Sequence, residues 1–190
     1  YSCEVQPQTD VELLREYAAD GSEAAFGELV RRHADLVYSA ALRQVGDPEA
    51  ARDVTQNVFG DLARKARSLR GGVLLVGWLY RGTRYAALNE LRSERRRQQR
   101  ERLAMELLQP ADEPAMEWEH IRAVIDEAVA SLNDHDRDAV LLRFFKNQNL
   151  ATVGAALGIS EDAAQKRVTR ALDKLRDFLA RRGVKSAAGG

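Results

Sequence analysis

Leu150-Ala-Thr-Val-Gly-Ala-Ala-Leu-Gly-Ile-Ser160, followed by Glu161-Asp-Ala-Ala-Gln-Lys-Arg-Val168, is the stretch that decides how the second half of this chain folds. A short helix is expected to end at Gly158, because glycine adopts the positive φ that a tight turn requires. Ile159 then fills the angle between two helices, and Ser160 caps the second one. The pattern predicts a helix-turn-helix whose first helix turns three side chains inward: Val153, Ala156 and Leu157.

The helix that follows Ser160 has an apolar face and a polar face. Its inward positions are Ala164, Val168, Ala171, Leu172, Leu175 and Leu179. Gln165, Lys166, Arg167 and Arg170 lie near its start, where a recognition helix enters the major groove, and their donor groups can read base edges. The same turn also joins helices in bundles that bind no DNA, so the prediction of DNA binding depends on the basic face beside it.

Charge is segregated along the chain although it sums to zero. The 190 residues carry 29 Lys and Arg against 29 Asp and Glu. The net charge is −6 over residues 1–60, +5 over 81–102, −8 over 103–138 and +6 over 166–190. Two basic segments separated by an acidic one suit a chain that touches a polyanion at two places.

Apolar residues recur at helical spacing through most of the chain, and no alternating pattern with hairpin turns competes with them. Gly46-Asp47-Pro48 predicts the end of one helix and the capped start of the next. The fold class is predicted to be all-α, with two small helical domains joined by a flexible acidic linker and the helix-turn-helix in the second. The expected boundaries are 10–105 for the first domain, 106–118 for the linker and 119–183 for the second domain.

The first basic segment is predicted to lie on a helix that begins near Leu75, after the Gly71-Gly72 loop, and ends by Leu108. On this helix Arg81, Arg84, Arg92 and Arg95 fall on one face, flanked by Tyr85, Asn89 and Arg96. Guanidinium groups in a row fit phosphates, and Tyr85 or Trp78 could stack on an unpaired base. Trp78 alone is better explained by core packing.

Several functions find no support in the sequence. His33, His120 and His135 lie on separate segments and are expected to be surface or boundary residues. No Cys/His metal spacing, phosphate loop or nucleophile motif is present, so neither catalysis nor a metal or other cofactor is expected. The longest apolar run, residues 73–79, is too short to cross a bilayer, and a single Cys3 fits a reducing cytoplasm.

Over about residues 10–182 the chain resembles the extracytoplasmic-function class of bacterial sigma factors. Asp53-Val-Thr-Gln-Asn-Val-Phe59 is similar to the family segment Asp-x-x-Gln-(Glu/Asp)-x-Phe, which docks on the clamp helices of core RNA polymerase. The resemblance implies polymerase contacts by Asp53, Gln56, Asn57 and Phe59. Asn57 stands where the family usually has an acid, which weakens one expected ion pair.

Trp78-Leu-Tyr-Arg-Gly-Thr-Arg-Tyr-Ala-Ala-Leu-Asn-Glu-Leu-Arg92 is similar to the family helix that recognises and melts the −10 promoter element. Tyr85 replaces a common Asn and Gly82 an apolar residue. The loop before this helix corresponds to the family loop that captures a flipped-out base. The resemblance implies −10 contacts by Arg70, Arg81, Arg84, Tyr85, Asn89, Arg92, Arg95 and Arg96.

The helix-turn-helix resembles the family module that reads the −35 element, with Gly154 in place of the usual Ala. The resemblance implies −35 contacts by Ser160, Gln165, Lys166, Arg167 and Arg170. It also implies three partners: core RNA polymerase, through its beta-prime clamp helices and beta flap; promoter DNA; and an anti-sigma factor, since family members are often held inactive by one.

Two other classes of protein remain as alternatives. A stand-alone helix-turn-helix regulator would bind its operator tightly without polymerase, with the N-terminal helices forming a dimer or a ligand site. A helical adaptor that binds only protein would leave the arginine row without a role, so that reversing those charges would change nothing.

Overall fold

The computed structural model describes residues 8–69, 73–104 and 116–183. Its first half consists of α1 (Asp10–Asp20), α2 (Glu23–Val45), α3 (Pro48–Lys65), the short 3-10 turn η1 (Ala66–Ser68) and α4 (Leu75–Ala104). Its second half consists of α5 (Met116–Ser131), α6 (Asp134–Val140), the π-helical turn η2 (Leu141–Phe145), α7 (Leu150–Leu157) and α8 (Glu161–Arg181). These described segments are helices and turns, which confirms the predicted all-α class. The predicted linker, residues 106–118, lies mostly outside them.

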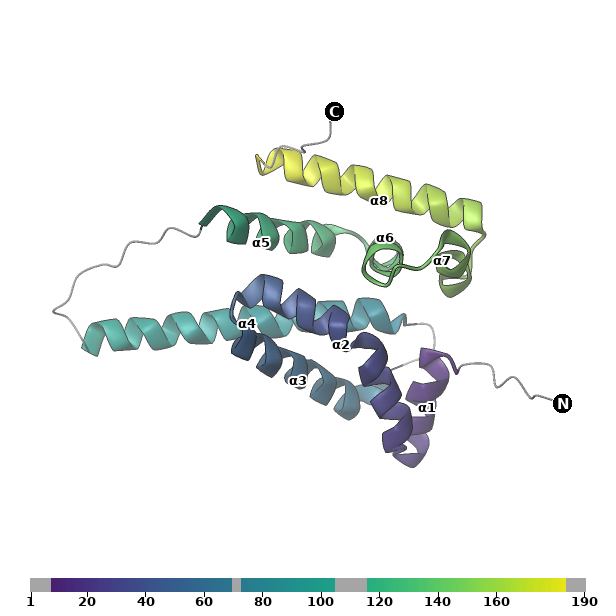
Figure 1. The fold of residues 1–190 in the computed structure, drawn as a ribbon, viewed down its shortest axis with the longest axis horizontal. Coiled ribbons are helices and arrows are strands. Elements are labelled where there is room, and N and C mark those ends of the chain that lie inside the picture. The colour runs from purple at the N-terminus through teal and green to yellow at the C-terminus, as the bar shows by residue number, and fades with distance from the viewer. Residues whose placement is uncertain (1–7, 70–72, 105–115, 184–190) are drawn as a thin grey trace.

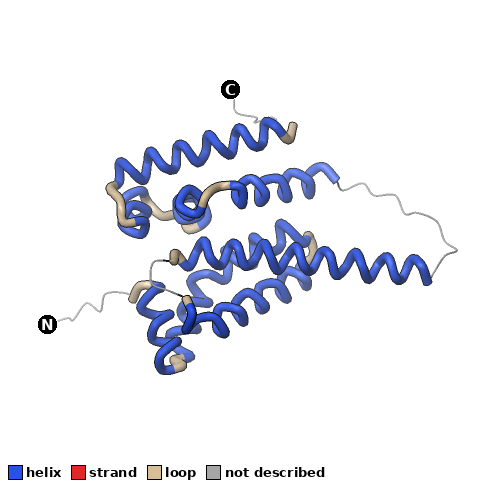
Figure 2. The backbone as a smooth tube through the Cα atoms, turned by 180° about the vertical axis from the view of Figure 1, so that it is seen from behind, coloured by secondary structure: helices blue, strands red, loops and turns tan. Residues whose placement is uncertain are grey.

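The helices form layers that Figures 1 and 2 show from opposite sides. α8 lies on one side of the molecule, α5, α6 and α7 form the middle, and α1 to α4 form the other side. α8 packs on α5, α6 and α7, while α2 and α4 contact α5 and α6. The C-terminal part of the long α4 extends beyond the other helices. Within the described ranges, no helix combines the length and the apolar character that crossing a membrane requires.

Local capping chemistry explains most helix ends. Gly46 follows α2 at a φ of 74°, and the Asp47 carboxylate accepts a hydrogen bond from the Ala50 amide at 2.7 Å before α3 begins with Pro48. Gly158 ends α7 at a φ of 67°, and the Ser160 hydroxyl caps α8. The predicted turn chemistry at both places is therefore confirmed.

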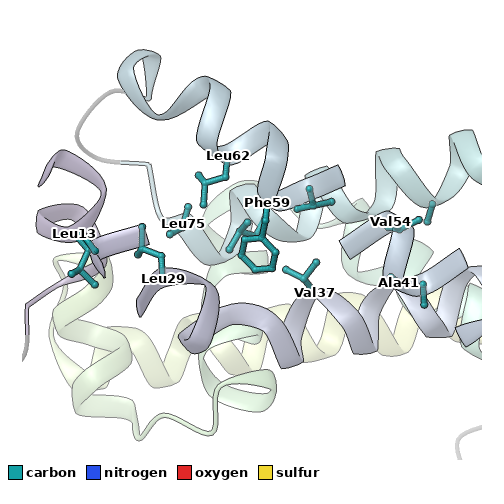
Figure 3. Close-up of a cluster of buried hydrophobic side chains, with 13 residues drawn as sticks. Leu13, Leu29, Val37, Ala41, Val54, Phe59, Leu62 and Leu75 are labelled. Carbon is teal, nitrogen blue, oxygen red and sulfur yellow. The ribbon is translucent and has the colours of Figure 1, made fainter. Parts of the chain in front are cut away.

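A first core holds α1 to α4 together (Figure 3). Leu29 and Val37 of α2 meet Val54, Phe59 and Leu62 of α3, and the start of α4 closes the cluster. Burial of these side chains removes apolar surface from water, which is worth about 1.5–3 kcal/mol for each large side chain. This core fixes the exposed faces of α3 and α4, where the polymerase and −10 contacts were predicted.

A second core is shared by both halves of the chain, which the sequence did not predict. Leu36 and Ala40 of α2 and Val76 and Tyr80 of α4 pack in one cluster with residues from the second half: Val129, Ala139, Leu141, Leu142, Val153, Ala164 and Val168. The helix-turn-helix therefore rests on the first half rather than standing apart from it.

Two expectations about single side chains were wrong. His33 is 3% exposed rather than a surface or boundary residue, because its Nε2 lies 2.7 Å from Asp10 Oδ2 and joins α2 to α1. Ala156 is exposed rather than inward, because α7 turns Val153 and Leu157 toward the second core and leaves Ala156 on its outer side.

Gly154→Ala is expected to destabilise the helix-turn-helix. A Cβ at Gly154 would lie 2.8 Å from the Ile159 carbonyl oxygen and 3.2 Å from the Ser160 backbone, so the turn itself would have to shift. We expect the free energy of unfolding to fall by about 1–3 kcal/mol, measured by urea denaturation.

Gly27→Ala is the matched control for this change, because no atom lies within 4 Å of a Cβ there and α2 is otherwise regular. It should instead gain up to about 1 kcal/mol from alanine's better helix propensity. An equal gain in both variants would show that the close approach at Gly154 does not exist.

Candidate functional site

The outer face of α8 brings the predicted −35 contacts together. Gln165, Lys166 and Arg170 are exposed and border, with Asp162 and Thr169, one shallow depression. Ser160 is exposed at the N-terminus and caps the helix by accepting from the Ala163 amide at 3.2 Å. Arg167 is half-buried and lies toward the side of this face. Four of the five predicted residues thus share one accessible surface near the start of the helix, and Arg167 borders it.

The predicted −10 contacts run along α4. Tyr85 is 68% exposed, and Arg92, Arg95 and Arg96 are exposed farther along the same helix. Arg84 and Asn89 are half-buried, and Asn89 lies 3.5 Å from an Arg92 nitrogen. The opposite side of α4 is fixed by Leu79 and Ala87 in the first core, and buried Thr83 donates to the Leu79 carbonyl. The row therefore has the accessibility that contact with a phosphate backbone requires.

Two predicted −10 contacts, Arg81 and Arg70, do not belong to this exposed row. Arg81 is exposed, but its Nη1 lies 2.9 Å from Asp134 Oδ1 of α6, so its charge already faces a carboxylate of the second half. Arg70 lies outside the described residues.

Trp78 packs against the first core, as predicted, with the Lys65 ammonium 6.0 Å from its ring centroid. Its outer edge lines a cavity of about 400 Å³ beside the start of α4. Leu14 of α1, Leu69 and Val73 form apolar walls of this cavity, and Arg67 supplies a cation. An apolar cavity with a cation suits a planar base attached to a phosphate.

The predicted polymerase-docking segment divides between two environments. Asp53, Gln56 and Asn57 are exposed on α3, whereas Phe59 is 7% exposed and belongs to the first core. Phe59 therefore supports the surface from beneath, and the small exposed part of its ring lines a groove between α2 and α3.

A shallow apolar groove of about 490 Å³ lies beside Gln56, between α2 and α3. Phe26, Val30 and Tyr38 of α2 form its far wall, and Gly60 and Ala63 of α3 line its near side. Sequence reasoning identified the α3 side through its motif but missed the α2 side. The helical spacing of apolar side chains on α2 was a signal, but such spacing does not distinguish a core contact from an exposed groove.

In the described part of the chain, no group of three or more His, Cys, Asp or Glu side chains is arranged to hold a metal ion. The described residues instead offer two cationic surfaces, one apolar groove and the cavity beside Trp78. Such surfaces bind macromolecules through charge, hydrogen bonding and shape.

Comparison with known proteins identifies two family regions in the chain. The family model for Sigma-70 region 2 matches residues 29–97, which span α2, α3 and most of α4. The model for Sigma-70, region 4 matches residues 128–177, which contain the helix-turn-helix.

Relatives align over nearly the whole chain. ECF RNA polymerase sigma factor SigE of Mycolicibacterium smegmatis is 31% identical over 96% of this chain and 74% of its own length. RNA polymerase sigma factor NccH of Alcaligenes xylosoxydans xylosoxydans is 33% identical over 91% of this chain and 96% of its own length. RNA polymerase sigma factor CarQ of Myxococcus xanthus is 29% identical over 84% of this chain. The chain therefore belongs to the extracytoplasmic-function family of RNA polymerase sigma factors.

Proposed function

We propose that the two cationic surfaces are the promoter-reading faces of this sigma factor. α8 reads the −35 element as duplex through Ser160, Gln165, Lys166, Arg167 and Arg170. α4 binds the −10 element and separates its strands through Arg81, Arg84, Tyr85, Asn89, Arg92, Arg95 and Arg96, with Arg70 from the preceding loop. The observation that carries this assignment is that each face is exposed while its helix is anchored by a core on its other side.

Capture of an unpaired base is assigned to the cavity beside Trp78. The cavity opens next to the start of α4, so a base separated from its partner along that helix would have an apolar space within reach. Stacking on an aromatic side chain stabilises an unpaired base by about 1–3 kcal/mol. Exposed Tyr85 offers a second stacking surface farther along α4.

Core polymerase docks on α3 and on the groove between α2 and α3. Asp53, Gln56 and Asn57 supply hydrogen bonds, and Phe26 and Tyr38 supply apolar area next to them. Apolar and aromatic area surrounded by polar groups is the usual composition of a protein–protein interface. Phe59 keeps α3 in place from beneath, and residues of the second half contact the beta flap.

The functional division is 10–105 for docking and the −10 element, 106–118 for the linker and 119–183 for the −35 element. The protein works in the cytoplasm, where polymerase and chromosome meet. It performs no chemistry of its own, because RNA synthesis belongs to the core enzyme.

Transcription by purified core polymerase on a library of genomic fragments tests this function. The protein should add new transcript 5′ ends that are absent with core polymerase alone, and it should bind the same fragments only weakly without core. A protein that is folded by circular dichroism, binds fragments tightly alone and adds no 5′ end would instead be the stand-alone regulator.

A further inference from the structure

The C-terminal part of α4 projects beyond the helices that pack around its start (Figures 1 and 2). In the described part of this helix, Ala87 is the last buried side chain, although α4 continues to Ala104. Over residues 92–100, which we call the α4 extension, every side chain except that of Glu94 is exposed. A helix gains most of its stability by packing an apolar face, so packing does not account for the α4 extension.

The α4 extension carries two cations without a carboxylate beside them. Exposed arginines of this chain commonly pair with a carboxylate three positions before them, and five such pairs are Glu28–Arg31, Glu49–Arg52, Asp61–Arg64, Asp173–Arg176 and, in the extension itself, Glu94–Arg97. Within the residues that the structure describes, no carboxylate is paired with Arg96 or Arg100. Arg100 Nε donates instead to the Arg96 carbonyl at 3.2 Å, so the Arg100 side chain points back along the helix toward Arg96. The two charges are available to an anion outside the molecule.

Four exposed side chains share one side of the α4 extension, and we call them the extension face. Ser93, Arg96, Gln99 and Arg100 border a shallow open hollow of about 520 Å³. Arg96, which also belongs to the predicted −10 row, lies four residues before Arg100, so the two Cβ atoms are about 5–6 Å apart. Two cations at this separation suit consecutive phosphates of one DNA strand, each of which carries a negative charge. Serine and glutamine side chains also donate hydrogen bonds to phosphate oxygens.

The extension face continues the side of α4 that begins at the cavity beside Trp78. At 3.6 residues per turn, Trp78, Tyr85 and Arg96 fall within about 20° of one another around the helix axis. Tyr85 and Arg100 are separated by about 22 Å along the axis, because an α-helix rises about 1.5 Å per residue. Duplex DNA rises about 3.4 Å per base pair, so this length corresponds to about six or seven base pairs. A base held near the start of α4 therefore places the extension face beside DNA several base pairs away.

The order of the elements gives the direction in which the α4 extension points. The chain leads from the end of α4 to the half that carries α8, which is proposed to read the −35 element. The far end of α4 is therefore expected on the upstream side of the −10 element, where the DNA is still double-stranded. The family model for Sigma-70 region 2 ends at residue 97, so Gln99 and Arg100 lie beyond the part of the chain that it matches.

We propose that Ser93, Arg96, Gln99 and Arg100 bind phosphates of the duplex that adjoins the upstream edge of the −10 element. The proposal rests on the proposed function for the direction in which α4 lies on the promoter. The extension face holds the double-stranded side of the junction, while Tyr85 and the cavity take bases from the separated strand. Contacts to phosphates fix position and carry no sequence information, so this contact is independent of the base sequence.

Two fork-shaped DNAs without a −35 element test the proposal, bound to the complex of core polymerase with this protein. Both present the −10 element as a single strand. The short fork has only two base pairs upstream of that element, and the long fork has twelve, of random sequence. The complex should bind the long fork about tenfold more tightly, and its slope of log affinity against log salt should be steeper by about 2, or about 0.9 for each arginine. Equal affinity and slope for the two forks would overturn the proposal alone, whereas failure to bind either fork would overturn the proposed function and the proposal with it.

Arg100→Ala should reduce the preference for the long fork about three- to fivefold and the difference in salt slope by about 1, with the affinity for the short fork unchanged within twofold. Arg97→Ala is the matched control, because it removes the same charge from the same helix, but Arg97 pairs with Glu94 and lies outside the extension face. The control should keep the preference within about twofold. Full preference in Arg100→Ala, or an equal loss in the control, would overturn the proposal.

A gain of binding is a second test, because an unfolded variant cannot produce it. Gln99→Lys adds a cation to the extension face and should raise the preference for the long fork about threefold and the difference in salt slope by about 1. Gln98→Lys adds the same charge one residue earlier, about 100° around the helix, where the Gln98 amide donates to Glu94 at 2.9 Å. This control should change neither quantity. Equal gains in the two variants would mean that overall charge acts without a defined face, which would overturn the proposal.

The contact should also be insensitive to base sequence. Long forks that differ only in the ten added base pairs should bind the complex within about twofold of one another. A preference of tenfold or more for one of these sequences, lost in Gln99→Ala, would show that the extension reads base edges and would overturn the assignment to phosphates.

Discussion

Gln56→Ala is expected to weaken binding to core polymerase at least tenfold while leaving the free energy of unfolding unchanged within about 0.5 kcal/mol. Gln56 is exposed and borders the apolar groove between α2 and α3, so its amide can bond a partner but supports no core. Affinity is measured by titration of labelled core polymerase, and stability by urea denaturation.

Phe59→Ala is expected to change mainly the free energy of unfolding, in contrast to Gln56→Ala. Its ring is 7% exposed in the first core, and removing it should lower the free energy of unfolding by about 3–5 kcal/mol. Because Phe59 also lines the groove, polymerase affinity of this variant is compared at equal concentrations of folded protein, measured by circular dichroism. Arg64→Ala, on the same helix but outside the groove, is the control for both variants. Equal polymerase affinity for Gln56→Ala and Arg64→Ala would contradict the docking assignment.

Lys166→Ala combined with Arg170→Ala is expected to weaken binding of the polymerase complex to its promoter by about 10- to 100-fold. Both side chains are exposed on the outer face of α8, and a loss of this size corresponds to about 1.4–2.8 kcal/mol for the two contacts together. The slope of log affinity against log salt should also fall by about 1 for each lost phosphate contact.

Arg176→Ala is the matched control, because Arg176 lies on α8, is 67% exposed and pairs with Asp173 away from the reading face. It should leave promoter affinity within about twofold of the unchanged protein. Equal losses in the control and the double variant would mean that α8 acts through its overall charge and reads no sequence.

Local chemistry made much of this fold predictable. Gly46-Asp47-Pro48 and Gly158-Ile-Ser160 specify their helix ends within a few residues, because caps and positive-φ glycines act on neighbouring backbone groups. The helix containing Trp78 and Arg81 was likewise predicted to start at Leu75, where α4 begins. Exposure of Gln165 and Arg92 followed from the helical period alone.

The shared second core could not be predicted in the same way. Arg43 and Asp126 lie 83 residues apart, and nothing next to either of them indicates its partner. Leu36 lies on the apolar stripe of α2, but helical spacing gives no sign that this side chain faces the second half. The motif assigned Phe59 to polymerase docking, and only the packing of α3 on α2 shows that most of its ring lies in the first core.

Two shorter features had local signals that were overlooked. Thr9 and Glu12 form a capping box that starts α1, and Gly21 at a φ of 69° followed by the Ser22 cap separates α1 from α2. The π-helical turn at Leu141–Phe145 has no comparable signature in the neighbouring sequence, and its residues Leu141 and Leu142 are buried in the second core.

We expect this chain to open promoter DNA only together with core polymerase, and strand opening can be measured directly. Permanganate, which reacts with unpaired thymines, is applied to a promoter obtained from the transcription library. We predict reactive thymines about 10 base pairs upstream of the start site only when both proteins are present. The reaction should be at least tenfold weaker in the Arg92→Ala, Arg96→Ala double variant, which removes two exposed cations of the proposed −10 face, although the variant still binds polymerase. Thymines that stay unreactive with both proteins present, on DNA that this protein binds tightly by itself, would contradict the account.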